Sequence, residues 1–568
     1  MKYSFLVDYY EKLESTTSKL EKTKILAELF RKVSTQDLEK VVLLIQGKVY
    51  PKYTQLELGI ATQMMMKAIN RATGYSEKEI EEIFKKTGDL GLTAKECLEK
   101  RKQVTLFRKK LELNDVFEKI RKLALITGEK SQEKKLSVIA ELLTSAEPRE
   151  AIYIVRTILE ELRTGAAEGI IRDAIAKAFL ISEKSTKEEK EEAVKAVEYA
   201  WNILSDFGEV AKIAKEKGIK GLKKVKPILG KPIQVMLGLA AKNIESVIKE
   251  FGKVAAEWKF DGVRVQIHKK GNKVWIFTRR LENITRQFPD IVELTRRGLK
   301  AEECIVEGEA LAVDPKTNIP MPFQVLSQRI HRKYEIEKMM RQIPIQVNLF
   351  DVVYVDGKIL ISKPFIERRK MLEKIVNIIP KKFQLAKQII SDNLKDLEKF
   401  YHEALNAKQE GIFLKVLNSP YVFGRHVGGW YKIKPIMETL DLVIVGAEWG
   451  TGTRAKWLSS YVLACRDPDT GDFLRCGMMG TGLTEDQFKL MTETLKPLIL
   501  KEKGREVYLK PKVVVEVAYQ EIQKSPNYES GFALRFPRLV RVREDKSPEE
   551  ADTIDRIKEL FKSQGRAG

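Results

Sequence analysis

The spacing of apolar residues changes along the chain and divides it into regions of different fold class. Up to about Lys220, apolar residues return at the spacing of amphipathic helices. A clear example is the run Leu26, Leu29, Phe30 and Val33. Thr186 and Glu189 have the three-residue separation of a capping box and predict the start of another helix. Residues 1–220 are therefore expected to form an all-α domain.

The rest of the chain is rich in strands. A Lys- and Gly-rich stretch over residues 215–231 is typical of a linker. Short alternating segments follow, mixed with helices such as one over residues 368–378, and predict an α+β domain over 221–435. After Pro435 strands dominate, with turns expected at 450–452 and 469–472, so residues 436–568 are expected to form a small β-barrel.

The charge balance limits the partners. The chain has 568 residues, a formal net charge of +22 and a pI near 9.4, which suits a polyanion such as nucleic acid. Its four cysteines lie far apart without Cys-x-x-Cys spacing, which argues against a zinc ribbon and fits a reducing cytoplasm. We expect no secretory signal or membrane span. Few Cys and His among many charged residues also fit a thermophile.

The string Lys259-Phe260-Asp261-Gly262-Val263-Arg264 carries the first chemical signal. Its alternation predicts two strands joined by an Asp-Gly turn, with Lys259 at a rigid rim. A lysine with a pKa near ~10.4 is protonated at neutral pH and becomes a nucleophile only when burial or a nearby cation lowers that pKa. Arg264 is such a cation. Taken alone, the string also fits a surface hairpin with scattered charge.

Further strings downstream bear groups for anions, metals and bases. Arg279, after a predicted strand, offers a guanidinium to an anion. Glu307 and Glu309 are two residues apart and therefore face one side of a strand, where they suit magnesium or a ribose hydroxyl. Phe350-Asp351 closes an apolar strand, and its ring fits either the core or a stacked base.

The last strings of this region end in lysines. Glu410 stands at the start of the β-rich run that ends at Lys415. Strand alternation puts these two side chains on opposite faces, so only Glu410 is expected at a metal. Lys432 and Lys434 share one face, where two ammonium groups can hold phosphates as point charges. The alternative is that these lysines only protect an edge strand from pairing with another chain.

The order of these strings resembles that of the nucleotidyltransferase superfamily of ligases and messenger RNA capping enzymes. In that resemblance, Lys259 is the lysine that becomes adenylylated, Glu257 reads the adenine edge and Phe350 stacks on the base. The family positions that hold the ribose and phosphates are matched by Arg264, Arg279, Glu309 and Arg425. Glu309 and Glu410 match metal-site acids, and Lys432 and Lys434 bear on the α-phosphate. Many relatives have Asp-Gly-Glu instead of Glu307-Gly308-Glu309, which leaves Glu307 without an assigned role.

Two regions resemble ligases rather than capping enzymes. Arg535-Phe536-Pro537-Arg538, followed by Asp545 and Lys546, is similar to the C-terminal signature that orients pyrophosphate. Arg163-Thr164-Gly165 resembles a turn that meets DNA phosphates, which places Arg163 and Gly165 at DNA. The whole chain is similar to archaeal replicative ligases, and its C-terminal barrel is then an OB-fold.

The resemblance implies an ATP-dependent DNA ligase that seals nicks in duplex DNA in replication, repair and recombination, and so serves cell division. The reaction runs through a lysyl-AMP enzyme and an adenylylated 5′-phosphate, with ATP and Mg²⁺ or Mn²⁺. A monomer in the cytoplasm is expected. A sliding clamp is a further expected partner, with Gln103, Leu106 and Phe107 as anchors. Leu6, Tyr9 and Tyr10 are the alternative clamp segment.

Three competing functions remain open from sequence. An NAD-dependent ligase normally carries a cysteine-rich zinc module, which this chain lacks. An RNA ligase or capping enzyme shares the Lys259 string but is not expected to have the helical front. A basic DNA-binding scaffold with a decayed pocket is the alternative that is not an enzyme, although each assigned position retains a chemically competent residue.

Overall fold

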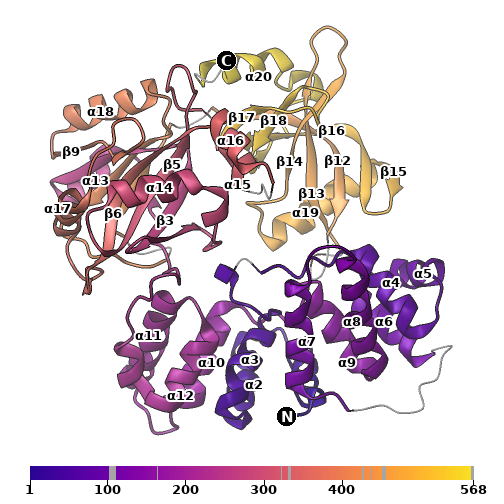
Figure 1. The fold of residues 1–568 in the computed structure, drawn as a ribbon. Helices are drawn as coiled ribbons and strands as arrows, with labels where there is room; N and C mark the ends of the chain where they lie inside the picture. The colour runs from indigo at the N-terminus through magenta and orange to yellow at the C-terminus, as the bar shows by residue number, and fades with distance from the viewer. Residues whose placement is uncertain are drawn as a thin grey trace. The chain divides into compact units, whose positions relative to one another are not determined.

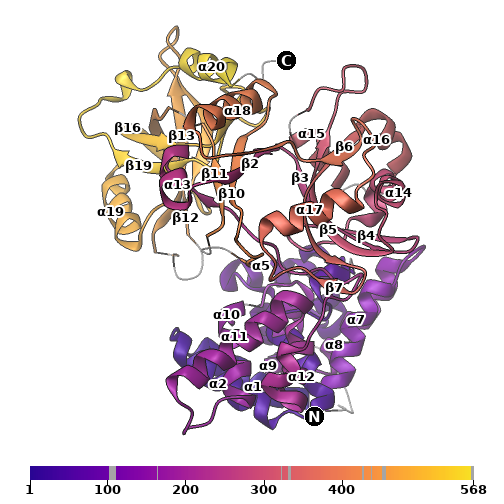
Figure 2. The same ribbon diagram turned by 90° about the vertical axis from the view of Figure 1, so that its left-hand side faces the viewer.

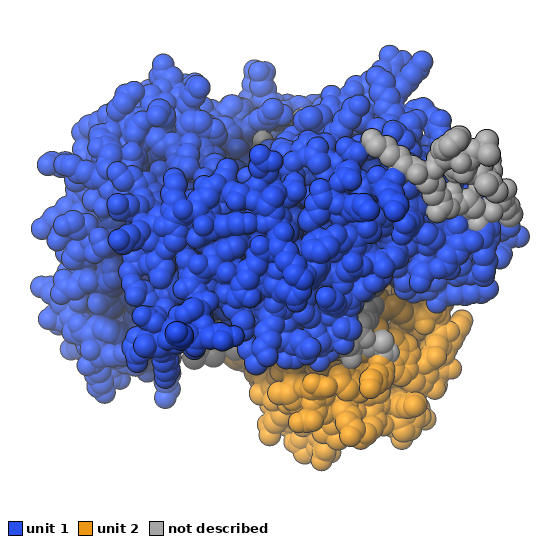
Figure 3. All heavy atoms as spheres, turned by 90° about the horizontal axis from the view of Figure 1, so that it is seen from below, with its two compact units in different colours: residues 1–397, 413–432 blue, residues 398–412, 433–568 orange. Residues whose placement is uncertain are grey.

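In the computed structural model the chain divides into two compact units, Met1–Leu397 with Phe413–Lys432, and Glu398–Ile412 with Ile433–Gly568 (Figure 3). We call these unit 1 and unit 2 and describe each by itself. The structure describes residues 1–54, 56–100, 110–162, 164–321, 323–330, 334–424, 428–435, 438–450, 454 and 456–564. Within these residues no helix is long and apolar enough to cross a membrane.

Unit 1 begins with a helical region, as the sequence predicts (Figure 1). Its helices are α1 (Tyr3–Glu14), α2 (Lys19–Lys32), α3 (Thr35–Ile45), α4 (Thr62–Thr73), α5 (Glu77–Thr87), α6 (Leu90–Glu99), α7 (Leu113–Leu125), α8 (Ser131–Ser145), α9 (Pro148–Ile158), α10 (Glu168–Phe179), α11 (Lys187–Leu204) and α12 (Phe207–Lys223). The predicted apolar positions Leu26, Leu29, Phe30 and Val33 are all buried. The capping box of Thr186 and Glu189 is present at the start of α11. Both predictions are confirmed.

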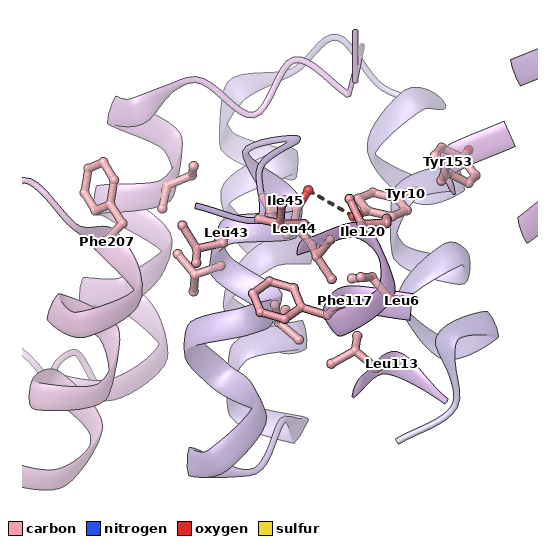
Figure 4. Packing of buried hydrophobic residues seen from close by; sticks show 14 of the residues in the cluster. Leu6, Tyr10, Leu43, Leu44, Ile45, Leu113, Phe117, Ile120, Tyr153 and Phe207 are labelled. Carbon is pink, nitrogen blue, oxygen red and sulfur yellow. Dashed lines mark hydrogen bonds between the residues drawn. The ribbon is translucent and has the colours of Figure 1, made fainter. Parts of the chain in front are cut away.

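The core of this region joins helices that are far apart in sequence (Figure 4). Tyr10 of α1 is fully buried, stacks on Tyr153 of α9 with ring centroids 4.6 Å apart, and donates a hydrogen bond to Leu44 O at 3.0 Å. Phe117 and Ile120 of α7 belong to the same cluster. These contacts across α1, α3, α7 and α9 make the region one packed body, because each helix buries its apolar face against the others.

The predicted linker over 215–231 is partly wrong. Helix α12 continues to Lys223, with a break at Gly218, whose φ is +59°. The helix resumes after this break because Leu222 lies in the core. Glycine takes a positive φ without steric cost. Gly218 in the Lys- and Gly-rich stretch therefore produces a kink inside a helix and does not start a linker.

Two sheets follow, and all their residues belong to unit 1 except Gly411, Ile412 and Ile433 at strand ends. The first has the order β1-β11-β10-β2-β9, from β1 (Leu239–Ala240), β11 (Trp430–Ile433), β10 (Gly411–Val416), β2 (Val254–Lys259) and β9 (Gln388–Ser391). The second has the order β4-β3-β5-β6-β7, with β8 beside β6; its strands are β3 (Val263–Lys270), β4 (Lys273–Thr278), β5 (Glu303–Ala312), β6 (Ile345–Val355), β7 (Lys358–Ile359) and β8 (Phe383–Leu385). The α+β class of this region is confirmed.

The two strands predicted around Lys259 are present and are joined at the Asp261-Gly262 turn, as expected. They do not pair with each other, so the surface hairpin that the string alone also fits is ruled out. Strand β2, which ends at Lys259, belongs to the first sheet, and β3 belongs to the second. The Asp261-Gly262 turn therefore carries the chain from one sheet to the other. Alternation along each strand is the same in both arrangements, so the residue pattern could not distinguish them.

Several helices lie in this part of the chain, and three of them pack against strands of the second sheet. The helices are α13 (Ile244–Phe251), α14 (Pro289–Gly298), α15 (Phe323–Ile330), α16 (Ile336–Gln342), α17 (Phe365–Ile375) and α18 (Leu394–Asn406). Helix α17 packs beside β6 (Figure 2). Strand β6 does not close at Phe350-Asp351, as the sequence suggested, but runs on to Val355. It continues because Asp351 is neutralised: its carboxylate accepts from Arg368 Nε at 2.9 Å and Nη2 at 3.0 Å, with both side chains fully buried.

Unit 2 consists mainly of antiparallel strands. They are β12 (Leu440–Trp449), β13 (Leu458–Arg466), β14 (Phe473–Met479), β15 (Ile499–Lys503), β16 (Glu506–Ala518), β17 (Glu521–Lys524), β18 (Phe532–Arg535) and β19 (Arg538–Val542). The main sheet has the order β14-β13-β12-β16-β15, with β19 on β16, and β17 pairs with β18. Helices α19 (Glu485–Leu495) and α20 (Ile554–Ser563) complete the unit. The predicted C-terminal β-domain is confirmed.

Candidate active site

Lys259 is the last residue of β2, where the chain leaves the first sheet. Its side chain is half-buried, and its ammonium lies 5.6 Å from the centroid of the Phe413 ring. The turn that follows needs glycine, since a Cβ on Gly262 would collide with the carbonyl oxygen of Ala310 on β5. The close approach of the turn to β5 of the second sheet therefore restricts the residue that can follow Asp261 to glycine.

Glu257 lies two residues before Lys259 on the same strand and is the centre of a buried charge cluster. Its carboxylate is 2 % exposed and contacts Lys415 Nζ at 2.5 Å, Arg369 Nη1 at 3.2 Å and Gln388 Nε2 at 2.8 Å. Gln388 is its strand partner on β9. A carboxylate has about four acceptor positions, so these three contacts leave about one for a ligand. This is compatible with the predicted contact to a base edge.

Lys415, which the sequence did not assign to the site, is the main partner of Glu257. Its side chain is 1 % exposed, and the ammonium lies 4.1 Å from the Trp430 ring centroid and 4.7 Å from that of Phe350. Burial lowers the pKa of Lys415, while the Glu257 carboxylate opposes that shift. A signal was present in sequence: a lysine within the apolar run Ile412-Phe413-Leu414 needs a buried counter-charge.

Phe350 and Trp430 line the same cluster. Their ring centroids are 5.8 Å apart in an edge-to-face arrangement, and Phe350 is half-buried. The Arg264 guanidinium lies 5.4 Å from the Phe350 ring centroid. Lysine and arginine therefore both lie beside this aromatic ring, an arrangement that cation–π attraction stabilises. Phe350 is thus placed at the charge cluster, not in the apolar core of the second sheet.

Arg264 is held by Glu307, the residue that the sequence left without a role. Arg264 Nη2 contacts Glu307 Oε2 at 2.6 Å, and Nη1 donates to Met236 O at 2.6 Å. Glu307 is fully buried and also accepts from Tyr421 OH at 2.9 Å and from Gln266 Nε2 at 3.3 Å. Because these contacts use much of the guanidinium, Arg264 links β3 to Glu307 and Met236 as well as facing the Phe350 ring.

Glu309, Arg279 and Lys432 lie at more accessible positions of unit 1. Glu309 is on the same face of β5 as Glu307, is half-buried and is the strand partner of Arg264. Arg279 directly follows β4 and is exposed. Lys432 is half-buried on β11, where its strand partner is Ala240 of β1.

Two predicted residues meet in unit 2. Lys434 forms an ion pair with Glu410, which directly precedes β10. The adjacent Gly411 has a φ of +134°, and a Cβ there would collide with the Ile433 carbonyl oxygen. Glu410, the proposed metal ligand, and Lys434, a proposed phosphate-binding lysine, therefore form an ion pair. The backbone contact beside this pair is possible only with glycine at position 411.

The C-terminal basic residues form an ion-pair network of their own in unit 2. Arg543 donates to Asp441 and to Asp545, and Lys546 Nζ contacts Asp441 Oδ2 at 2.7 Å. The hydrogen bond from Arg543 lowers the pKa of Asp545 to about 2. Arg535 lies 3.7 Å from Glu521, and Arg538 is exposed at the start of β19. The sequence pointed to these basic groups but not to Asp441.

The predicted DNA turn lies between α9 and α10. Gly165 is exposed with a φ of +67°, and the buried Lys22 of α2 donates from Nζ to Thr164 O at 2.6 Å. A lysine from another helix thus fixes the carbonyl that precedes Gly165. Helix α10 begins three residues after Gly165, at Glu168.

Several predicted residues lie outside the described residues. They are Arg163, Arg425, Gln103, Leu106 and Phe107. The alternative clamp segment on α1 is a different case, because Leu6, Tyr9 and Tyr10 are buried in the helical core. These three side chains hold the fold together and present no surface to a partner, so that alternative is wrong.

Comparison with known proteins gives matches along most of the chain. Residues 2–176 match the family described as "DNA ligase N terminus", 235–434 match "ATP dependent DNA ligase domain", and 454–546 match "ATP dependent DNA ligase C terminal region". The chain is 48 % identical to "DNA ligase" of Nanoarchaeum equitans, with 99 % of each chain covered. It is 47 % identical to "DNA ligase" of Thermococcus onnurineus, over 100 % of this chain and 99 % of that one.

A further relative and a solved structure agree. The chain is 44 % identical to "DNA ligase" of Archaeoglobus fulgidus, with 99 % of each chain covered. Its fold is similar to the structure "Pmar-Lig_PreS3", with a TM-score of 0.56 and 17 % identity over 95 % of this chain and 99 % of that one.

Proposed function

The chain belongs to the ATP-dependent DNA ligases, and we propose that Lys259 is the residue whose amine carries AMP in its reaction. Enzymes of this family seal nicks in DNA, and this chain does so in replication and repair. The observation that carries the proposal is the place of Lys259. It ends the strand on which Glu257, two residues earlier, sits in a buried charge cluster beside the Phe350 ring.

The proposed roles follow from that placement. Glu257 receives a hydrogen bond from the adenine edge at its remaining acceptor position, and Phe350 stacks on the base. Arg264, Arg279, Glu309 and Arg425 hold ribose and phosphates, and Lys432 with Lys434 neutralise the α-phosphate. The support from the structure is the Glu257–Lys415 pair and the contacts among Phe350, Trp430 and Arg264.

The reaction then proceeds in three transfers. The neutral Nζ of Lys259 attacks the α-phosphorus of ATP, a P–N bond forms, and pyrophosphate leaves with the electrons of the broken P–O bond. The 5′-phosphate of a nick displaces the lysine and takes AMP. The adjacent 3′-hydroxyl displaces AMP and seals the strand. Such transfers depend mainly on positioning, which removes roughly 7–11 kcal/mol of the barrier.

A divalent metal, Mg²⁺ or Mn²⁺, is proposed to assist through Glu309 and Glu410. No group of three or more His, Cys, Asp or Glu side chains suited to a metal occurs in the part of the chain that the structure describes. Mg²⁺ is typically bound by one or two carboxylates together with substrate phosphates and water, so each of these acids is of a suitable type. Such a metal disperses charge on the phosphate oxygens.

The partners and location are also proposed. Arg163 and Gly165 contact the phosphates of nicked duplex DNA, supported by the turn that Lys22 fixes. Arg535, Arg538, Asp545 and Lys546 orient pyrophosphate. A sliding clamp binds through Gln103, Leu106 and Phe107. The protein works as a monomer in the cytoplasm, where its four buried cysteines stay reduced.

The test is Lys259→Ala. This variant is expected to take up no label from α-labelled ATP, because the substitution removes the amine that attacks the α-phosphorus. It should still bind nicked duplex within a few fold of the wild type. The matched control is Lys270→Ala, an exposed lysine at the end of the next strand, which should label normally. Labelling retained by Lys259→Ala would remove Lys259 from this role.

A further inference from the structure

Asp441, the second residue of β12 in unit 2, joins two cations through one carboxylate. Arg543 Nη1 lies 3.1 Å from its Oδ1 and 2.8 Å from its Oδ2, and Lys546 Nζ lies 2.7 Å from Oδ2. The Asp441 side chain is only 12 % exposed. More than a hundred residues separate Asp441 from both cations, so the tertiary fold brings this trio together.

The two cations are used in different ways. Arg543 also donates from Nε and Nη2 to Asp545, at 2.9 and 2.8 Å, so all three of its nitrogens face carboxylates. Its guanidinium is therefore a brace between Asp441 and Asp545. Among the described residues, Asp441 is the only side chain to which the Lys546 ammonium is bonded, and this lysine is 29 % exposed. An ammonium has three donors, which leaves two for a ligand.

The backbone of Asp441 is fixed as firmly as its carboxylate. Its N–H donates to Asp552 Oδ2 at 2.7 Å, and Asp552 N–H donates back to Asp441 O at 2.8 Å. On the sheet, its strand partner is Glu516 of β16. A carboxylate held on both sides can hold a flexible lysine side chain in one place. That matters because a free lysine loses up to about 2 kcal/mol of rotamer entropy when it is ordered.

We propose that Asp441 is a positioning residue for the first transfer: it holds the Lys546 ammonium where pyrophosphate departs, with Arg543 as its brace. This inference rests on the proposed function, in which Lys546 orients pyrophosphate. It adds a residue that acts only through Lys546 and only in the step that releases or consumes pyrophosphate. Sealing of DNA that already carries AMP does not involve pyrophosphate and is therefore independent of Asp441.

The experiment compares Asp441→Asn and Asp441→Glu with the matched control Glu516→Gln. Glu516 lies opposite Asp441 on the neighbouring strand and pairs instead with Arg541. Three rates are measured on the full chain: labelling by α-labelled ATP, loss of label from enzyme-AMP against pyrophosphate concentration, and sealing of a synthetic nick with a pre-adenylylated 5′ end. In the second, a pyrophosphate oxygen attacks the phosphorus, the P–N bond breaks, and ATP and the free amine of Lys259 re-form.

Asp441→Asn is expected to slow labelling by about tenfold or more, as loss of a charge-assisted bond would. It should also raise the half-saturating pyrophosphate concentration by a similar factor, while sealing of the pre-adenylylated nick stays within about twofold. Asp441→Glu keeps the charge and should recover part of the loss. Glu516→Gln should leave all three rates unchanged.

Three results would overturn the inference. Unchanged labelling by Asp441→Asn means that Lys546 does not need the carboxylate. Faster labelling means that Asp441 competes with pyrophosphate for the cations. An equal loss of labelling and of sealing means that the residue only supports the unit, which a matching fall in the unfolding midpoint would show. Failure of the Lys259 proposal is separate, because it is read from labelling of Lys259→Ala.

Discussion

Replacing Lys415 by methionine tests the buried charge cluster around Glu257. The ammonium is 1 % exposed and lies 2.5 Å from the Glu257 carboxylate, which is itself 2 % exposed. Methionine fills a similar volume without the charge, so the main effect is the loss of one partner from a buried ion pair. Such a loss typically costs about 3–5 kcal/mol, because it leaves a charge unpaired in a poorly polarisable environment.

The structure places the expected cost at the lower end of that range. Glu257 keeps Arg369 at 3.2 Å and Gln388 at 2.8 Å after the substitution, so its carboxylate is not left alone. The lost contacts of the ammonium with the Trp430 and Phe350 rings act in the other direction. We therefore expect about 3 kcal/mol less stability for the cooperative transition that contains this cluster.

The assay is denaturant unfolding followed by tryptophan fluorescence, because the Trp430 ring centroid is 4.1 Å from the ammonium. Lys415→Met, Glu257→Gln and the double variant form a double-mutant cycle. We expect the double variant to be less destabilised than the sum of the single ones by at least about 1.5 kcal/mol, because it leaves no unpaired charge at this pair. Labelling by α-labelled ATP should fall in both single variants.

The matched control is Lys249→Met, which removes an exposed lysine from an ion pair with Glu245 on α13. It should leave the unfolding midpoint unchanged, because water and salt screen exposed pairs. A cost below about 1 kcal/mol for Lys415→Met, or single effects that add within about 0.5 kcal/mol, would refute the reasoning. Either result would mean that Lys415 is neutral or hydrated in the folded chain.

Two further substitutions test the strands beside this site. Burial lowers the pKa of His268 from 6.5 to about 3, so below pH 6.5 the unfolded chain takes up a proton that the folded chain refuses, and stability falls with pH down to about 3. His268→Gln has no such group to protonate and should not lose this stability. The free energy of unfolding of His268→Gln minus that of the wild type, measured by denaturant titration, should therefore be about 2 kcal/mol higher at pH 5 than at pH 7.5. Gly262→Ala should lower both labelling by ATP and the unfolding midpoint, because its Cβ would collide with the Ala310 carbonyl oxygen.

Each of these two substitutions has its own check. An identical stability difference between His268→Gln and the wild type at both pH values would show that the imidazole is protonated in the folded chain. For the glycine, Gly169→Ala is the matched control, because this residue lies in α10 with no atom near an added Cβ. Alanine there should raise stability by about 0.5–1 kcal/mol. Normal labelling by Gly262→Ala would show that the turn moves away from β5 without affecting the position of Lys259.

The sequence alone was sufficient to predict the features that depend on residues close together in the chain. Helical spacing predicted the all-α front, and the capping box of Thr186 and Glu189 forms as expected. Alternation and turns predicted the C-terminal β-domain. The order of short strings from Lys259 to Lys546 identified the family, and the full-length relatives confirm that assignment. Local signals succeed here because spacing, capping and strand alternation depend on residues within a few positions of one another.

The pairing of distant groups was decided by the tertiary structure. Glu257 meets Arg369 from 112 residues away and Gln388 from 131, and Asp441 meets Lys546 across 105. The chain between Lys259 and Val263 passes from one sheet to another, although the same residues would also suit a hairpin. Strand order decides these outcomes, and alternation shows only which side chains share a face, not which strand lies opposite. The partners of Glu257, Arg264 and Lys546 could therefore be identified only from the tertiary structure.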